Sequence, residues 1–136
     1  MTIRQDLKIN QGETWSWVYT HIDSTGSAID LTGYTARMSV KTNFTGSTEA
    51  YLSTGADADG GIISLGGVVG TVTLSMTAAQ TTALTDNSSL DLLRLPQEEP
   101  IKQQVKLRYD LELVSGAGDV TRALEGWVTV SREITG

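Results

Sequence analysis

Apolar and polar side chains alternate one by one along most of this 136-residue chain, which is the periodicity of β-strands with one buried face. The alternation is clearest in segment 14–22, where one face carries three aromatic residues and the only histidine of the chain: Trp15, Trp17, Tyr19 and His21. Small hydroxyl residues fill most of the opposite face, so the aromatic face is the one that folding should bury. The pattern predicts a strand whose aromatic row packs in a core or against a neighbouring subunit.

The same period of two recurs in six later segments, which are separated by turn-forming residues. Segment 43–52 has the weakest pattern and is expected to be a short edge strand. Gly66 and Gly67 separate two alternating segments and predict a hairpin. The six segments are 34–41, 43–52, 62–65, 70–76, 105–113 and 120–130.

One short helix is predicted between these strands. Thr77 and Gln80 fit a capping box, in which the threonine hydroxyl accepts from the amide of Gln80 and the glutamine side chain reaches back to the amide of Thr77. The helix should fray by about Leu84. Segment 86–103, which follows, is long, polar and interrupted by prolines, and a structureless segment of this length is often functional.

Several short strands with one helix and no crossover helices predict an all-β fold, an antiparallel Greek-key sandwich, in a single domain over 1–136 with a long loop at 86–103. In the last strand, Val120, Leu124 and Val128 are expected to share the inward face. The predicted core collects the apolar faces of the strands: Trp15, Trp17, Tyr19, Tyr34, Met38, Leu107, Tyr109, Leu111, Leu124 and Val128.

Composition narrows the classes of function. The net charge of −6 and the lack of a basic cluster argue against a partner that is nucleic acid. Without cysteine there is no disulfide framework and no thiolate metal site. No apolar run approaches the roughly 20 residues of a membrane helix, and the first residues show no apolar region of a secretory signal. We therefore expect neither a membrane partner nor secretion.

Three blocks of sequence carry a resemblance to a known family. They read GSAIDLTGYTARMSVK (26–41), GTVTLSMTAAQTTAL (70–84) and YDLELVSGAGDVTRALEGWVTVSREIT (109–135). In this order the blocks resemble the Ig-like tail and baseplate proteins of tailed bacteriophages, including the N-terminal module of upper baseplate proteins. The resemblance implies an Ig-like sandwich and a virion structural protein without catalytic activity or cofactor. The chain departs from the family pattern at 86–103, where a shorter link is expected.

Candidate chemistry along the chain is sparse. His21 is the single imidazole, and no G-x-S-x-G motif accompanies it, so a catalytic or metal-binding histidine is not favoured. Asp57 and Asp59 resemble the start of a calcium loop, but the positions that should supply the later ligands hold Gly61 and Val68. The glycine pairs lack the G-K-[ST] ending of a phosphate loop. We therefore expect no cofactor and no metal.

Charged residues on the penultimate strand admit two interpretations. Asp110 and Glu112 share a face with Lys106 and Arg108, and paired carboxylates can act in glycoside hydrolysis. A solvated or interfacial charged face is the favoured interpretation. The aromatic row of segment 14–22 likewise has the alternative of a platform that stacks sugars or bases.

Leucines in segment 86–103 are the remaining anomaly, because a loop seldom leaves so many of them in water. They either fold onto their own sandwich or dock on another chain, and docking is favoured. The candidate interface residues are Leu90, Leu92, Leu93, Leu95 and Pro96.

Together these observations predict a non-enzymatic tail or baseplate component, located in the virion and assembled in the bacterial host cytoplasm. Its expected partners are other virion proteins and copies of itself in a ring. Two alternatives stay open: a capsid decoration or head–tail joining protein of the same fold, and a carbohydrate-binding module that uses the tryptophan row.

Overall fold

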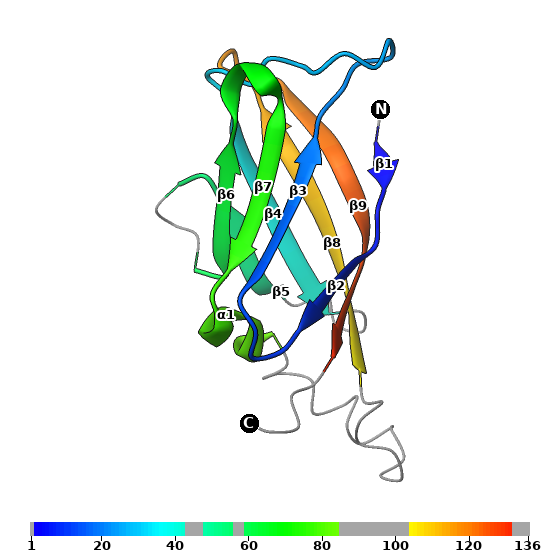
Figure 1. Cartoon of the computed structure of the whole chain (residues 1–136), viewed down its shortest axis with the longest axis vertical. Helices are drawn as coiled ribbons and strands as arrows, with labels where there is room; N and C mark the ends of the chain where they lie inside the picture. Colours follow the sequence, from blue (N-terminus) through cyan, green and yellow to red (C-terminus); the bar gives the residue numbers. More distant parts are fainter. Residues whose placement is uncertain (1, 43–47, 56–58, 85–103, 132–136) are drawn as a thin grey trace, which may run out of the picture.

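The computed structural model describes residues 2–42, 48–55, 59–84 and 104–131. These residues form nine strands, one turn of 3-10 helix and one short α-helix (Figure 1). The elements are β1 (Ile3–Arg4), β2 (Leu7–Asn10), β3 (Trp15–Thr20), β4 (Thr35–Thr42), β5 (Thr48–Ser53), β6 (Gly61–Leu65), η1 (Gly67–Val69), β7 (Thr71–Met76), α1 (Ala78–Ala83), β8 (Gln104–Val114) and β9 (Val120–Ser131).

The strands form one hydrogen-bonded path, β1-β9-β8-β4-β5-β6-β7-β3, with β2 also paired to β9. The path curls into two layers, because β5 and β6 are joined by only a short parallel pairing. Figure 1 shows β6, β7 and β3 in front of β4, β8 and β9. All pairings are antiparallel except those of β5 with β6 and of β1 and β2 with β9.

This strand order is that of an Ig-like sandwich. In order of pairing, β3-β7-β6 takes the place of strands B-E-D, and β5-β4-β8-β9 takes the place of C′-C-F-G. The predicted class, an all-β Ig-like sandwich with one short helix, is therefore confirmed.

The core lies between the two layers and is filled by alternate residues of the long strands. Met38 on β4, Leu111 on β8 and Leu74 on β7 are each at most 1% exposed. The predicted core residues that the structure buries are Tyr19, Met38, Leu107, Tyr109, Leu111, Leu124 and Val128. Three others only pack against the core from its margin and are half-buried: Trp15, Trp17 and Tyr34.

The predicted hairpin and helix are both present. Strands β6 and β7 pair antiparallel, and η1 makes the turn between them. The Thr77 hydroxyl accepts from the Gln80 amide at 3.2 Å, and the Gln80 side chain accepts from the Thr77 amide at 2.9 Å. The capping box therefore starts α1 where the sequence indicates, and the helix ends at Ala83, with Leu84 as its C-cap.

Two predictions about the strands are wrong. Segment 43–52 was expected at an edge, yet β5 lies between β4 and β6, because the parallel pairing closes the sandwich there. Val120 was expected to face inward with Leu124, yet its side chain is 51% exposed. A bulge opposite Leu111 and Glu112 inserts an extra residue into β9, and this shift reverses the side on which the preceding residues lie.

The N-terminal strands β1 and β2 have no counterpart in the predicted elements. They pair with β9 on either side of a kink at Gln5 and Asp6. The Asp6 carboxylate accepts from the Trp127 amide at 3.0 Å, and the Tyr109 hydroxyl donates to the Gln5 carbonyl. A Cβ on Gly126 would lie 2.5 Å from that carbonyl oxygen, so only glycine allows this close approach.

Candidate functional site

The two outer faces of the sandwich differ sharply in chemistry. The outer face of β4, β8 and β9, which we call the charged face, carries five cations and three carboxylates: Arg37, Lys41, Lys106, Arg108, Arg122, Asp110, Glu112 and Glu125. The outer face of β3, β7 and β6, which we call the hydroxyl face, carries no charged residue: Ser16, Val18, Thr20, Ile62, Ser64, Thr71, Thr73 and Ser75. The charged face is net positive, although the whole chain has a net charge of −6.

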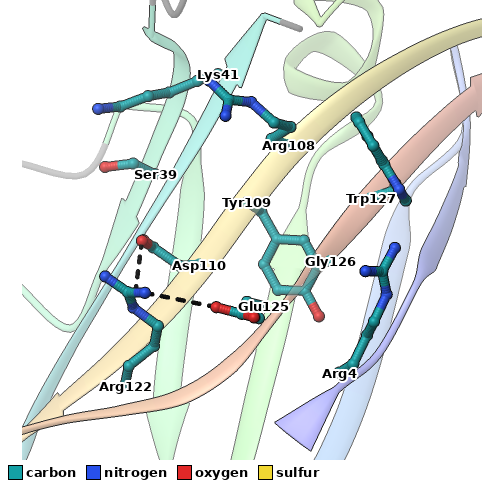
Figure 2. Close-up of a pocket in the computed structure, with 10 residues that line it drawn as sticks. All are labelled: Arg4, Ser39, Lys41, Arg108, Tyr109, Asp110, Arg122, Glu125, Gly126 and Trp127. Carbon is teal, nitrogen blue, oxygen red and sulfur yellow. Dashed lines mark hydrogen bonds and ion pairs between the residues drawn. The ribbon is translucent and has the colours of Figure 1, made fainter. Parts of the chain in front are cut away.

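Strand register arranges the charged face in cross-strand rows. One row places Asp110 of β8 opposite Glu125 of β9, and Arg122 reaches both carboxylates. The distances from the Arg122 guanidinium are 3.7 Å to Asp110 and 3.5 Å to Glu125 (Figure 2). A second row pairs Arg37 with Glu112 at 2.8 Å, a contact that raises the pKa of Arg37 through hydrogen bonding and charge attraction. In these two rows each of the three carboxylates forms an ion pair with an arginine, and Arg122 is shared by two of them.

The third row has no such compensation. Lys41 of β4 lies directly opposite Arg108 of β8, and Arg108 lies opposite Trp127 of β9. We call these three residues the cationic row. Within the described part of the chain, neither Lys41 nor Arg108 forms an ion pair. Like charges directly opposite each other on paired strands destabilise the pairing.

A hollow of about 460 Å³ opens beside the cationic row. Figure 2 shows the Arg108 guanidinium near the base of the Lys41 side chain, whose ammonium extends away from it, and Arg4 at another end of the hollow. Trp127 adds an apolar wall, and the Lys106 ammonium lies 5.8 Å from the centroid of its ring. The lining combines cations with an aromatic ring at the cationic row, and the carboxylates Asp110 and Glu125, with Arg122 between them, line another part of the hollow. Only the part at the cationic row is therefore suited to carboxylate-bearing groups.

Tyr109 also lines the hollow. Its ring is buried in the core, and its hydroxyl points toward the N-terminal kink at Gln5 and Asp6. Burial raises the pKa of this phenol far above its usual range, and the carboxylates of Asp6 and Glu125 raise it further. The hydroxyl is therefore a fixed hydrogen-bond donor rather than an acid. Its role is to hold β1 and β2 against β9 at the margin of the hollow.

The hydroxyl face offers a different kind of contact. Val18 and Ile62 are 56% and 58% exposed, and they are surrounded by serine and threonine. Among the described strands, β3 pairs only with β7, so its other edge has no strand beside it. No charge or proline protects this edge, and such edges pair readily with another chain.

A groove of about 770 Å³ lies where the aromatic row ends, and its lining includes Tyr19 and His21. The Tyr19 hydroxyl and the His21 Nδ1 atom are 2.6 Å apart. Burial and the positive N-terminus lower the pKa of His21, and burial raises the pKa of Tyr19. Both groups are therefore neutral at pH 7. The row stays in line, with ring centroids 6.2 Å apart from Trp17 to Tyr19 and 5.8 Å apart from Tyr19 to His21.

The other sequence candidates fall in separate places. The predicted interface residues Leu90, Leu92, Leu93, Leu95 and Pro96 lie outside the described residues, as does Asp57. In the described ranges, no group of three or more His, Asp or Glu residues is placed to hold a metal ion. None of the helices in those ranges is long and apolar enough to cross a membrane.

Sequence reasoning found part of the charged face. Asp110, Glu112, Lys106 and Arg108 were placed on one face of a strand, and the structure brings them to the outer surface. It missed Lys41 and Trp127, which join this face from β4 and β9. Their alternation pattern indicated an outward direction for each residue, but only the strand register sets them beside Arg108.

Comparisons with known proteins found a likeness to a solved structure and no relative by sequence. No protein-family model matches the chain, and no curated protein matches it. Among solved structures, it is similar to a chain in the crystal structure of ICOS in complex with ICOS-L and an anti ICOS-L VNAR domain. The identity is 14% and the TM-score 0.46, over 97% of this chain and 56% of that one.

Proposed function

We propose that this chain is a non-enzymatic structural component of a bacteriophage tail or baseplate, where it assembles with copies of itself and with other virion proteins. The family resemblance of the three sequence blocks supports this proposal. Those blocks fall on β4, on β7 with α1, and on β8 with β9. They therefore cover strands from both layers of the sandwich rather than a peripheral segment.

The observation that carries the proposal is the hydroxyl face with its free edge. Val18 and Ile62 are exposed on a surface without charge, and β3 leaves backbone donors and acceptors at its outer edge. A monomer of this size usually protects such an edge with charge, proline or a covering segment. Contact with a neighbouring subunit would bury the exposed valine and isoleucine and pair the strand edge.

A carbohydrate-binding module is the candidate from another class, and it depends on an exposed tryptophan platform. Trp15 and Trp17 are half-buried and pack against the core. Fluorescence quenching by acrylamide separates the two functions: strong quenching that a bound oligosaccharide suppresses would favour the module. A capsid decoration or head–tail joining role differs from the tail role only in position within the particle.

The proposal is tested in particles released from the bacterium that carries the gene. Mass spectrometry of gradient-purified particles should detect the chain in a fixed ratio to the major tail protein. Purified particles without the chain, prepared under conditions in which the chain is expressed, would contradict a structural role.

A further inference from the structure

The cationic row differs from the two neighbouring rows of the charged face, in which every carboxylate forms an ion pair with an arginine. On the same face, the opposed carboxylates Asp110 and Glu125 share Arg122, whereas the opposed cations Lys41 and Arg108 share no acid within the described residues. Two cations on directly opposed residues at the margin of a hollow create a local positive potential. Opposed like charges are costly for the isolated domain, and the pairing becomes favourable when anionic groups bind to the two cations.

The acidic groups that complement the row are present on the same protein. One end of the sandwich is built from the β3–β4 connection, η1 and the β8–β9 turn. These described segments carry Asp23, Asp30 and Asp119 and contain no lysine or arginine. We call this surface the acidic end.

Two carboxylates of the acidic end, those of Asp23 and Asp30, are held in position. Asp23 Oδ1 accepts from the amides of Thr25 at 2.9 Å and Ser27 at 3.1 Å, and Asp30 Oδ1 accepts from the Thr32 amide at 2.9 Å. These hydrogen bonds lower the pKa of both carboxyls, with the threonine hydroxyl of each turn as the first cause. The Oδ2 atoms take part in no hydrogen bond within the described part of the chain, so they remain available to a partner.

We propose that the acidic end of one copy docks on the cationic row of the next copy, with its carboxylates against Lys41 and Arg108 and the neighbouring loop against Trp127. This inference rests on the proposed assembly function and names a second copy of the chain as the partner. The two surfaces differ, so the contact is heterologous, and repetition gives a ring when the rotation closes. The hydroxyl face stays free for other virion proteins.

Charge exchange between the two surfaces tests the contact. The first variant carries Lys41→Glu and Arg108→Glu, and the second carries Asp30→Lys and Asp119→Lys. All four side chains are exposed, and circular dichroism with thermal unfolding establishes that both variants fold. Lys8→Glu, on β2 and outside the hollow, is the control for a change of charge alone.

Sedimentation velocity of the purified full chain is the measurement. The wild-type protein and Lys8→Glu should self-associate at low ionic strength and dissociate at roughly 1 M salt, where the Debye length is about 3 Å. The association of each double variant alone should be weaker than that of the wild type by at least about tenfold. An equimolar mixture of the two should associate again, because each reversed surface then meets an opposite charge.

Failure of the mixture to associate would overturn the proposal, as would a wild-type protein that stays monomeric at low salt. Binding of polyglutamate or heparin by such a monomer, lost in the first variant, would assign the cationic row to another anion and likewise overturn the second-copy contact. None of these outcomes contradicts the virion structural role, which is tested separately by mass spectrometry of purified particles. Failure of the second-copy contact can therefore be distinguished from failure of the proposed function.

Discussion

Replacing Tyr109 with phenylalanine removes one hydroxyl from the place where the N-terminal strands meet the sandwich. The hydroxyl donates to the Gln5 carbonyl, and the residue is only 4% exposed. The ring remains, so the packing of the core is retained. The change isolates the hydrogen bond that holds the kink between β1 and β2 over Gly126.

The expected loss is that of the hydrogen bond itself, because Gln5 is an exposed residue and water can replace the lost donor. A hydrogen bond of this kind contributes about 0.5–1.5 kcal/mol. With a urea dependence of about 2 kcal/mol per molar, the unfolding midpoint should fall by roughly 0.3–0.8 M. Tyr34→Phe is the matched control, because the Tyr34 hydroxyl makes no hydrogen bond to the described residues and should cost much less.

The direction in which the pKa of Tyr109 is shifted provides a second test. The pKa is raised in the folded state, so the contribution of this group to stability is complete below pH 10 and is lost as the pH rises above it. Tyr109→Phe should therefore unfold with a shallower pH dependence in the alkaline range than the wild type. Tyr19, whose pKa is also raised, keeps part of that dependence in both proteins.

Urea unfolding followed by tryptophan fluorescence, repeated between neutral and alkaline pH, measures both effects. Equal midpoints for Tyr109→Phe and Tyr34→Phe would refute the role of the hydroxyl. Hydrogen exchange adds a local check, because the amide of Trp127, which donates to Asp6, should lose protection in Tyr109→Phe but not in Tyr34→Phe.

Three further predictions concern the core, the kink and the groove. Leu111→Ala should lower the free energy of unfolding by about 2–5 kcal/mol in a urea titration. Trp17→Ala, at the margin of the core, should lower it by less. Equal losses would place the tryptophan side chain fully inside the core. Gly126→Ala should lower the thermal midpoint and release β1 and β2, seen as faster hydrogen exchange, because its Cβ would meet the Gln5 carbonyl; an unchanged midpoint would contradict the close approach. The pKa of His21 is lowered, so wild-type stability should fall as the pH drops below 6.5, and His21→Gln should flatten this slope in thermal scans at successive pH values.

Local signals were sufficient for several elements of the fold. The capping box at Thr77 and Gln80 starts α1 through contacts within one turn of helix, so it can be recognised from the sequence alone. The glycine turn between β6 and β7 is equally local. Alternation also indicated the inward faces of β4 and β8, because a period of two in the sequence is sufficient to show which side chains of a strand share the buried face.

Long-range pairing set the limits of prediction. The bulge in β9 depends on its register with β8, and nothing near Val120 signals that this residue turns outward. The alternation of Leu7 and Ile9 was a usable signal for β2, but its parallel pairing with β9 joins opposite ends of the chain. The cationic row has the same origin, because Lys41 and Trp127 flank Arg108 only through the registers of three strands.

The position of the chain within a particle tests the account most directly. A tag at the C-terminus, labelled with gold and imaged by electron microscopy of purified particles, should mark the tail or its baseplate in a ring of copies. Gold confined to the head would favour the capsid or joining role. Particles that carry no label, although the tagged protein is expressed and soluble, would contradict a virion structural protein.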